Sequence, residues 1–272
     1  MGREARFPEG RIERADVLTD LSPMERKARQ MVCLPLDGLR SLSDVTDTVE
    51  ELSAFVGLFK VGKESFTRFG PDVVALVKEH GAGVFLDLKY HDIPNTVNGA
   101  ARAATELGVA MLNVHAAGGL AMMRAAKQGV DDAAPSAGGK PQIVAVTVLT
   151  SIDRDVLNRE CGVPGAVEDQ VLRLARLAQD AGLDGIVCSA TDLHALRDAL
   201  KPGFVFVTPG IKGTTTPAGE DQRRVMSPGG AVAAGSSLLV VGRAITAAAD
   251  RRATAREVLQ DIAKVLKSRD AR

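Results

Sequence analysis

Eight short, continuous apolar runs separated by amphipathic stretches are the feature of this sequence that most constrains its fold. No run alternates polar and apolar side chains, as a strand with one face in water would. Runs of this kind are typical of parallel strands that are covered on both faces. The sequence therefore predicts parallel strands over residues 31–36, 57–61, 83–88, 110–114, 142–149, 185–189, 204–208 and 237–242.

The stretches between the runs have the periodicity of amphipathic helices. Residues 41–56 place Val45, Val49 and Leu52 on one face, behind a capping serine at Ser41. Further helices are predicted over residues 71–81, 166–182 and 254–269.

Strands that alternate with helices indicate an α/β fold, and eight such units predict a (β/α)8 TIM barrel. A doubly wound sheet is the runner-up. It would usually carry a Gly-rich phosphate turn after its first strand, and LPLDGLRS (34–41) is not such a turn. We expect a single barrel domain over residues 31–272, preceded by a short helical extension over residues 1–30. In that extension, SPME (22–25) has the pattern of a helix capping box.

Composition excludes several classes of function. Lys plus Arg total 34 and Asp plus Glu total 34, and aromatic residues make up only 3%, so neither charge nor stacking favours nucleic acid as a partner. No apolar stretch approaches the roughly 18 residues needed to span a bilayer, and the charged N-terminus lacks the apolar region of a secretory signal. The three widely spaced cysteines form no zinc pattern. We therefore expect a cytoplasmic protein that binds neither nucleic acid nor membrane.

Charged residues interrupt the apolar pattern near the ends of the first three predicted strands. They are Asp37, Lys60, Asp87 and Lys89, with Asp92 in the loop that follows. A barrel places its working residues at the carboxyl ends of its strands, so these side chains are expected to converge. Each charge by itself has an equally good explanation as a solvated strand end. Five of them on three adjacent strands favour a paired cluster, because unpaired charges there would cost free energy.

The last two predicted strands carry a second signal. TPGIKG (208–213) is a Gly-containing turn after strand seven, and VVGRAI (240–245) ends strand eight. In barrels, the loops after these two strands commonly form a phosphate site. Arg243, directly after Gly242, is suited to hold a phosphate through two parallel hydrogen bonds.

These stretches resemble the orotidine 5′-phosphate decarboxylase family over nearly the whole predicted barrel. FLDLKYHDIPNT (85–96) matches that family's highly specific D-x-K-x-x-D-I-P-N-T signature. Four more segments agree with the family independently: FKVG (59–62), TPGI (208–211), DQRR (221–224) and VGRAI (241–245).

The resemblance implies a reaction and its catalytic residues. The family replaces the C6 carboxylate of orotidine 5′-monophosphate with a proton, giving UMP, and uses no metal or organic cofactor. By the family pattern, Lys89 stabilises and protonates the carbanion, while Asp87 lies against the departing carboxylate. Lys60 and Asp92 complete the charge network that holds Lys89.

The resemblance also implies how the nucleoside monophosphate is bound. The family is a homodimer, in which Asp92 and Thr96 would complete the neighbouring subunit's site. Ser151 matches the position that reads the pyrimidine edge, and residues 210–223 would form a lid. The residues implied in substrate binding are Asp37, Lys60, Ile93, Thr96, Ser151, Pro209, Gln222, Gly242 and Arg243.

Two rival functions remain open at this stage. A sugar-phosphate branch of the same superfamily uses Mg²⁺ held by an acid on strand two, a position occupied here by Lys60. A non-catalytic barrel that binds phosphate ligands would not need the row of acids and bases. We interpret His115 as structural and Cys188 as a cavity residue without an activating base.

Overall fold

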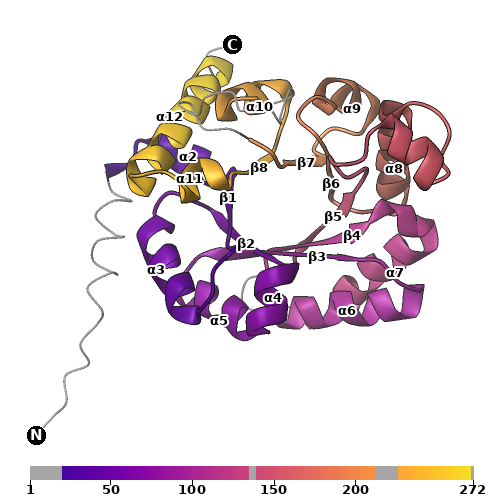
Figure 1. The fold of residues 1–272 in the computed structure, drawn as a ribbon, viewed down its shortest axis with the longest axis horizontal. Coiled ribbons are helices and arrows are strands. Elements are labelled where there is room, and N and C mark those ends of the chain that lie inside the picture. Colours follow the sequence, from indigo (N-terminus) through magenta and orange to yellow (C-terminus); the bar gives the residue numbers. More distant parts are fainter. Residues whose placement is uncertain (1–19, 135–138, 212–225, 271–272) are drawn as a thin grey trace, which may run out of the picture.

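The computed structural model describes residues 20–134, 139–211 and 226–270, and its centre is a closed barrel of parallel strands (Figure 1). Each strand pairs with its neighbours in chain order, and β8 closes the ring against β1. The prediction of eight parallel strands is confirmed. The strands are β1 (Val32–Pro35), β2 (Leu58–Gly62), β3 (Gly83–Tyr90), β4 (Met111–His115), β5 (Gln142–Val146), β6 (Gly185–Val187), β7 (Val205–Thr208) and β8 (Leu238–Val240).

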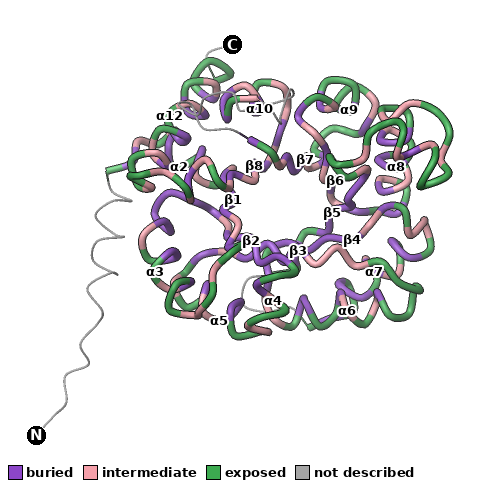
Figure 2. The backbone as a smooth tube through the Cα atoms, in the orientation of Figure 1, coloured by how far each residue is buried: buried purple, intermediate pink, exposed green. Residues whose placement is uncertain are grey.

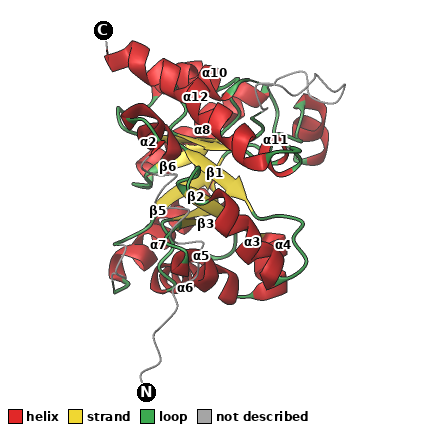
Figure 3. Ribbon diagram, turned by 90° about the vertical axis from the view of Figure 1, so that its left-hand side faces the viewer, coloured by secondary structure: helices red, strands yellow, loops and turns green. Residues whose placement is uncertain are grey.

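Helices surround this barrel, so the strands are enclosed on both sides when the molecule is viewed from the side (Figure 3). A 3₁₀ turn (η1, Ala116–Gly118) and a short π-helix (η2, Val156–Glu160) lie in the loops after β4 and β5. The α-helices are α2 (Pro23–Arg29), α3 (Leu42–Leu52), α4 (Lys63–Phe69), α5 (Asp72–Glu79), α6 (Pro94–Glu106), α7 (Gly119–Asp132), α8 (Val167–Asp180), α9 (Leu193–Ala199), α10 (Pro228–Ala234), α11 (Arg243–Thr246) and α12 (Arg251–Asp270).

Local sequence signals account for where the predicted helices begin. Ser41 caps α3 by accepting a hydrogen bond from the Asp44 amide, and Val45, Val49 and Leu52 are fully buried on its inner face. The other predicted helices correspond to α5, α8 and α12, whose ends lie within three residues of those expected.

The helix before the first strand is also formed as its sequence indicates. Ser22 and Glu25 make the reciprocal hydrogen bonds of a capping box at the start of α2. Leu21 and Ala28 are buried, and α2 packs against α12. The division of the chain at residue 30 stays a prediction.

The core has two layers, which appear as buried segments along the strands and the inner faces of the helices (Figure 2). The larger layer lies between strands and helices. The smaller one fills the barrel's interior and consists of Cys33, Phe85, Met111, Val144, Val207 and Leu238. Because apolar side chains occupy the interior, polar chemistry is confined to the carboxyl ends of the strands. Within the described ranges, no helix is long and apolar enough to cross a membrane.

Candidate active site

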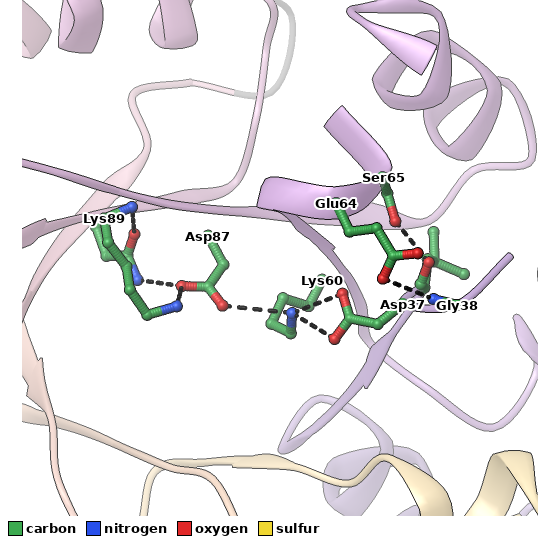
Figure 4. Close-up of polar contacts among 9 residues, drawn as sticks. Asp37, Gly38, Lys60, Glu64, Ser65, Asp87 and Lys89 are labelled. Carbon is green, nitrogen blue, oxygen red and sulfur yellow. Dashed lines mark hydrogen bonds and ion pairs between the residues drawn. The ribbon is translucent and has the colours of Figure 1, made fainter. Parts of the chain in front are cut away.

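Four of the predicted site residues meet at the carboxyl ends of β1, β2 and β3, where they form a continuous row (Figure 4). The Lys60 ammonium donates to both carboxylate oxygens of Asp37, at 3.1 and 3.0 Å. On its other side it lies 3.3 Å from Oδ2 of Asp87. The Lys89 ammonium donates to Oδ1 of Asp87 at 2.6 Å. The order is therefore acid, base, acid, base, and each inner group contacts two opposite charges.

The middle of this row is the least exposed to water. The side chains of Lys60 and Asp87 are each 11% exposed, against 48% for Asp37 and 26% for Lys89. Burial of the Lys60 ammonium lowers its pKa, but the charges of Asp87 and Asp37 outweigh this effect and raise the pKa above that of an ordinary lysine. Lys60 is consequently a permanent cation at neutral pH.

The loop after β1 is fixed so that Asp37 reaches Lys60. Ser65, at the start of α4, donates a buried hydrogen bond of 2.6 Å to the Leu36 carbonyl. Gly62 gives the pair room, since a Cβ atom there would lie 2.8 Å from both Oδ1 of Asp37 and the Lys60 ammonium. The glycine of the FKVG segment is thus required by the ion pair beside it.

Strand β3 bulges where it presents Asp87 and Lys89. Leu86 pairs with Leu112 of β4, but the next pair joins Tyr90 to Val114, so four steps along β3 match two along β4. Lys89 has a φ of 53°, the only left-handed value outside glycine among the described residues. This conformation costs about 1–2 kcal/mol in an L-residue. The bulge is therefore a strained feature that other contacts must hold.

Asn113, opposite the bulge on β4, supplies those contacts and was not predicted from the sequence. Its side-chain oxygen accepts the Lys89 backbone amide at 2.8 Å, and its amide nitrogen donates to Oδ1 of Asp87 at 2.6 Å. Asn113 is 1% exposed. The available signal was a single amide side chain within an apolar run, because a buried amide must find hydrogen-bond partners.

A cavity lies beside the row, and apart from Thr150 its other walls are apolar. Lys60, Asp87 and Lys89 form its polar wall. Among the residues on its other walls are Val146, Val148, Leu149, Val187, Cys188 and Pro209. This arrangement can bind a flat organic ring next to an ammonium group while excluding most of the surrounding water.

Cys188 belongs to the cavity wall but is not an activated nucleophile. Its burial, with a smaller contribution from the Asp192 charge, raises the pKa of the thiol. The thiol therefore stays protonated at neutral pH, as the sequence interpretation anticipated.

The loop after β3 does not join the row within this chain. Among the described residues, the Asp92 carboxylate forms no ion pair, and its Oδ1 accepts the Ile93 amide at 2.6 Å. Ile93 is 66% exposed, and Thr96 is also exposed, at the start of α6. All three residues are exposed, in the loop after β3 and at the start of α6.

The remaining predicted binding residues are placed unequally. Pro209 lines the cavity, whereas Ser151 is exposed in a turn, and its neighbour Thr150 takes the place on the wall. Gly242 caps α11 and Arg243 begins it, directly after β8. Gln222 and most of the predicted lid lie outside the described residues.

His115 lies at the end of β4 and its ring stands 5.4 Å from that of His91. Partial burial lowers the pKa of His115, and the neighbouring charges of His91, Lys63 and Lys89 lower it further. The ring is therefore neutral at pH 7, in keeping with a structural role. Among the described side chains, no three His, Cys, Asp or Glu gather as a metal site would require.

A closed parallel barrel that holds a row of alternating charges at the carboxyl ends of its strands defines the class of this protein as a (β/α)8-barrel enzyme. Residues 30–258 match the family described as Orotidine 5′-phosphate decarboxylase / HUMPS. The chain belongs to this family.

Individual relatives are similar over almost their whole length. An orotidine 5′-phosphate decarboxylase from Moorella thermoacetica is 50% identical over 252 residues, which make up 91% of this chain and 97% of that protein. One from Syntrophus aciditrophicus is 48% identical, over 90% of this chain and 97% of that protein. The crystal structure of orotidine 5′-phosphate decarboxylase from Lactobacillus acidophilus superposes with a TM-score of 0.76 at 37% identity, over 86% of this chain and 99% of that chain.

Proposed function

We propose that this protein decarboxylates orotidine 5′-monophosphate to UMP in pyrimidine synthesis, without a metal or organic cofactor. The observation that carries the proposal is the row formed by Asp37, Lys60, Asp87 and Lys89 beside an apolar cavity. The names of the curated relatives that match over nine-tenths of the chain support the same substrate.

The geometry fits the chemical demand of this reaction. When the bond between C6 and the carboxylate breaks, its electron pair stays on C6 and CO₂ leaves. The resulting carbanion has no electron sink in the pyrimidine ring, so the barrier must fall by about 20 kcal/mol through fixed charges and positioning. The Lys89 ammonium can stabilise the negative carbon and then donate it a proton. Asp87 keeps that ammonium aimed and places a negative charge near the departing carboxylate.

The position of Lys60 distinguishes this function from that of the Mg²⁺-dependent sugar-phosphate branch. Those enzymes place an acid on strand two to ligate the metal. Here strand β2 presents an ammonium that is held as a cation by two carboxylates. A cation at this point repels Mg²⁺.

The activity test is direct. Purified protein, dialysed against a chelator, is mixed with orotidine 5′-monophosphate, and the loss of the substrate's ultraviolet absorbance is followed. We expect full turnover with chelator present and no stimulation by added Mg²⁺. Absence of turnover, or turnover only with Mg²⁺, would count against the proposed function.

Phosphate binding is assigned to the loops after β7 and β8, with Arg243 as the principal cation. Replacing Arg243 with alanine should raise KM for the substrate about 100-fold, because a charge-assisted bond of two to three kcal/mol is lost. Steady-state kinetics on the variant and the parent measure this. The control is Arg252→Ala, at an exposed residue on α12. An unchanged KM in Arg243→Ala would contradict the role of Arg243 in phosphate binding.

We infer that the functional unit is a homodimer in which Asp92 and Thr96 complete the neighbouring subunit's site. The exposure of Ile93 and the outward placement of Asp92 support this inference, since both side chains would be covered by a partner.

Mixing two inactive variants tests the shared site. Asp92→Ala alone and Lys89→Ala alone should each be inactive, because every site lacks one of the two groups. In a mixed dimer, one of the two sites contains both wild-type residues. Co-refolding the variants should therefore restore about a quarter of parental activity, since half the dimers are mixed and each has one working site. If the mixture stays inactive, each subunit must carry its complete site alone.

A further inference from the structure

Asn113 bridges the two parts of the β3 bulge that carry the reactive groups. Its carboxamide is buried, so its hydrogen bond to Asp87 is shielded from water, and its bond to the Lys89 amide is partly shielded. One bond holds the Lys89 backbone amide and the other holds the Asp87 carboxylate. A single side chain on the neighbouring strand thus fixes the backbone of Lys89 and the side chain of Asp87.

The ladder between β3 and β4 explains why a side chain is needed there. Regular pairing stops after Leu86 and Leu112 and resumes at Tyr90 and Val114, with Asn113 lying between the two registers. Over this gap the Asn113 oxygen takes the place of the carbonyl that a regular ladder would offer to the Lys89 amide.

The second bond determines how the row is arranged. Oδ1 of Asp87 accepts from the Asn113 amide and from the Lys89 ammonium, both at 2.6 Å, while Oδ2 lies 3.3 Å from the Lys60 ammonium. Three donors approaching from three directions leave the carboxylate a single orientation. Without the Asn113 amide, the Asp87 carboxylate can rotate. The Lys89 ammonium that contacts it is then no longer held in one position.

We infer that Asn113 is a positioning residue of the site, which holds Lys89 in its left-handed conformation and orients Asp87 between the two ammonium groups. Its kinetic consequence rests on the proposed function. Among the described residues, the Asn113 side chain has hydrogen bonds to Lys89 and Asp87 and none to the Asp37–Lys60 pair. Its loss should therefore affect the chemical step and leave substrate capture largely unchanged.

Two variants separate the two hydrogen bonds. Asn113→Ala removes both, and kcat should fall about 100-fold while KM changes less than threefold, because a displacement of about 1 Å in the reacting groups has an effect of this size. Asn113→Asp keeps the acceptor for the Lys89 amide but sets a second carboxylate against Asp87. Its kcat should be low at neutral pH and recover as the pH falls, since the introduced carboxyl can donate again once protonated.

Ser236→Ala is the matched control. Ser236 is also buried and hydrogen-bonded within the barrel, to the Phe206 carbonyl and the Thr208 hydroxyl, but it lies two residues before β8. It should lower the midpoint of thermal unfolding as Asn113→Ala does, with kcat within threefold of the parent and no new pH dependence. If the kcat of Asn113→Ala stayed within threefold of the parent, as is expected for this control, the inference would be overturned.

Crystal structures of the variants decide the point independently of turnover. In Asn113→Ala, Lys89 should leave the left-handed region and its ammonium should move away from Asp87. If φ stays near 53° and the contact stays near 2.6 Å, Asn113 does not position either group, whatever the protein does with orotidine 5′-monophosphate. If the parent protein fails to turn over this substrate, the proposed function falls, and the two structures still decide the role of Asn113.

Discussion

Replacing Lys89 with alanine should lower kcat/KM for orotidine 5′-monophosphate by about 10⁵-fold while the barrel stays folded. About 10³ of this factor corresponds to the lost general acid, and about 10² to the lost charge beside the carbanion. The fold should survive because Asp87 keeps its contacts with Lys60 and Asn113.

Steady-state kinetics of this variant measure the loss of activity. Circular dichroism and thermal unfolding show whether the barrel stays folded. Lys127→Ala is the matched control, since Lys127 forms an ion pair with Asp131 one turn along α7 and does not line the cavity. The control should retain parental kcat/KM. Turnover by Lys89→Ala within tenfold of the parent would remove Lys89 from the chemical step.

Replacing Asp87 with asparagine should be less damaging to activity than the loss of Lys89, but more damaging to stability. The change keeps the shape of the side chain but removes the negative charge between two ammonium groups, one of them largely buried. We expect kcat/KM to fall by about 10³-fold or more. Breaking a buried ion pair by removing one partner should also lower the free energy of unfolding by about 3 kcal/mol.

The loss of stability in Asp87→Asn should depend on pH in a defined direction. The pKa of Lys60 is raised in the folded protein, so its pairing stabilises the fold fully below the ordinary lysine pKa of about 10.4. This contribution disappears as the pH rises through the raised pKa. The difference in unfolding free energy between parent and variant should therefore be largest at pH 7–9 and shrink at higher pH.

Urea unfolding of parent and variant across this pH range measures the difference. The exposed Asp131→Asn is the control and should change the free energy of unfolding by less than about 1 kcal/mol, as is usual for a surface ion pair. A variant as stable as the parent at pH 8 would show that the two ammonium groups do not need the carboxylate between them.

Much of the site was predictable because strand ends are visible in the sequence. Each charge of the row stands at the end of an apolar run, and parallel strands in a barrel bring such ends together. The cap of α3 at Ser41 was predictable in the same way, from local pattern. What this pattern did not give was which charges make contact, since Asp92 belongs to the same signature but lies outside the row of its own chain.

Local sequence pattern was enough to predict the order of strands and helices, the barrel architecture and the placement of Asp37, Lys60, Asp87 and Lys89 at its carboxyl end. These features depend on periodicities of a few residues, which neighbouring side chains encode directly. The tertiary structure alone decided the two-residue bulge in β3, the left-handed backbone of Lys89 and the bridge formed by Asn113. Those features arise from the register between two strands more than twenty residues apart, and register is set by packing around the whole ring, which no local pattern records.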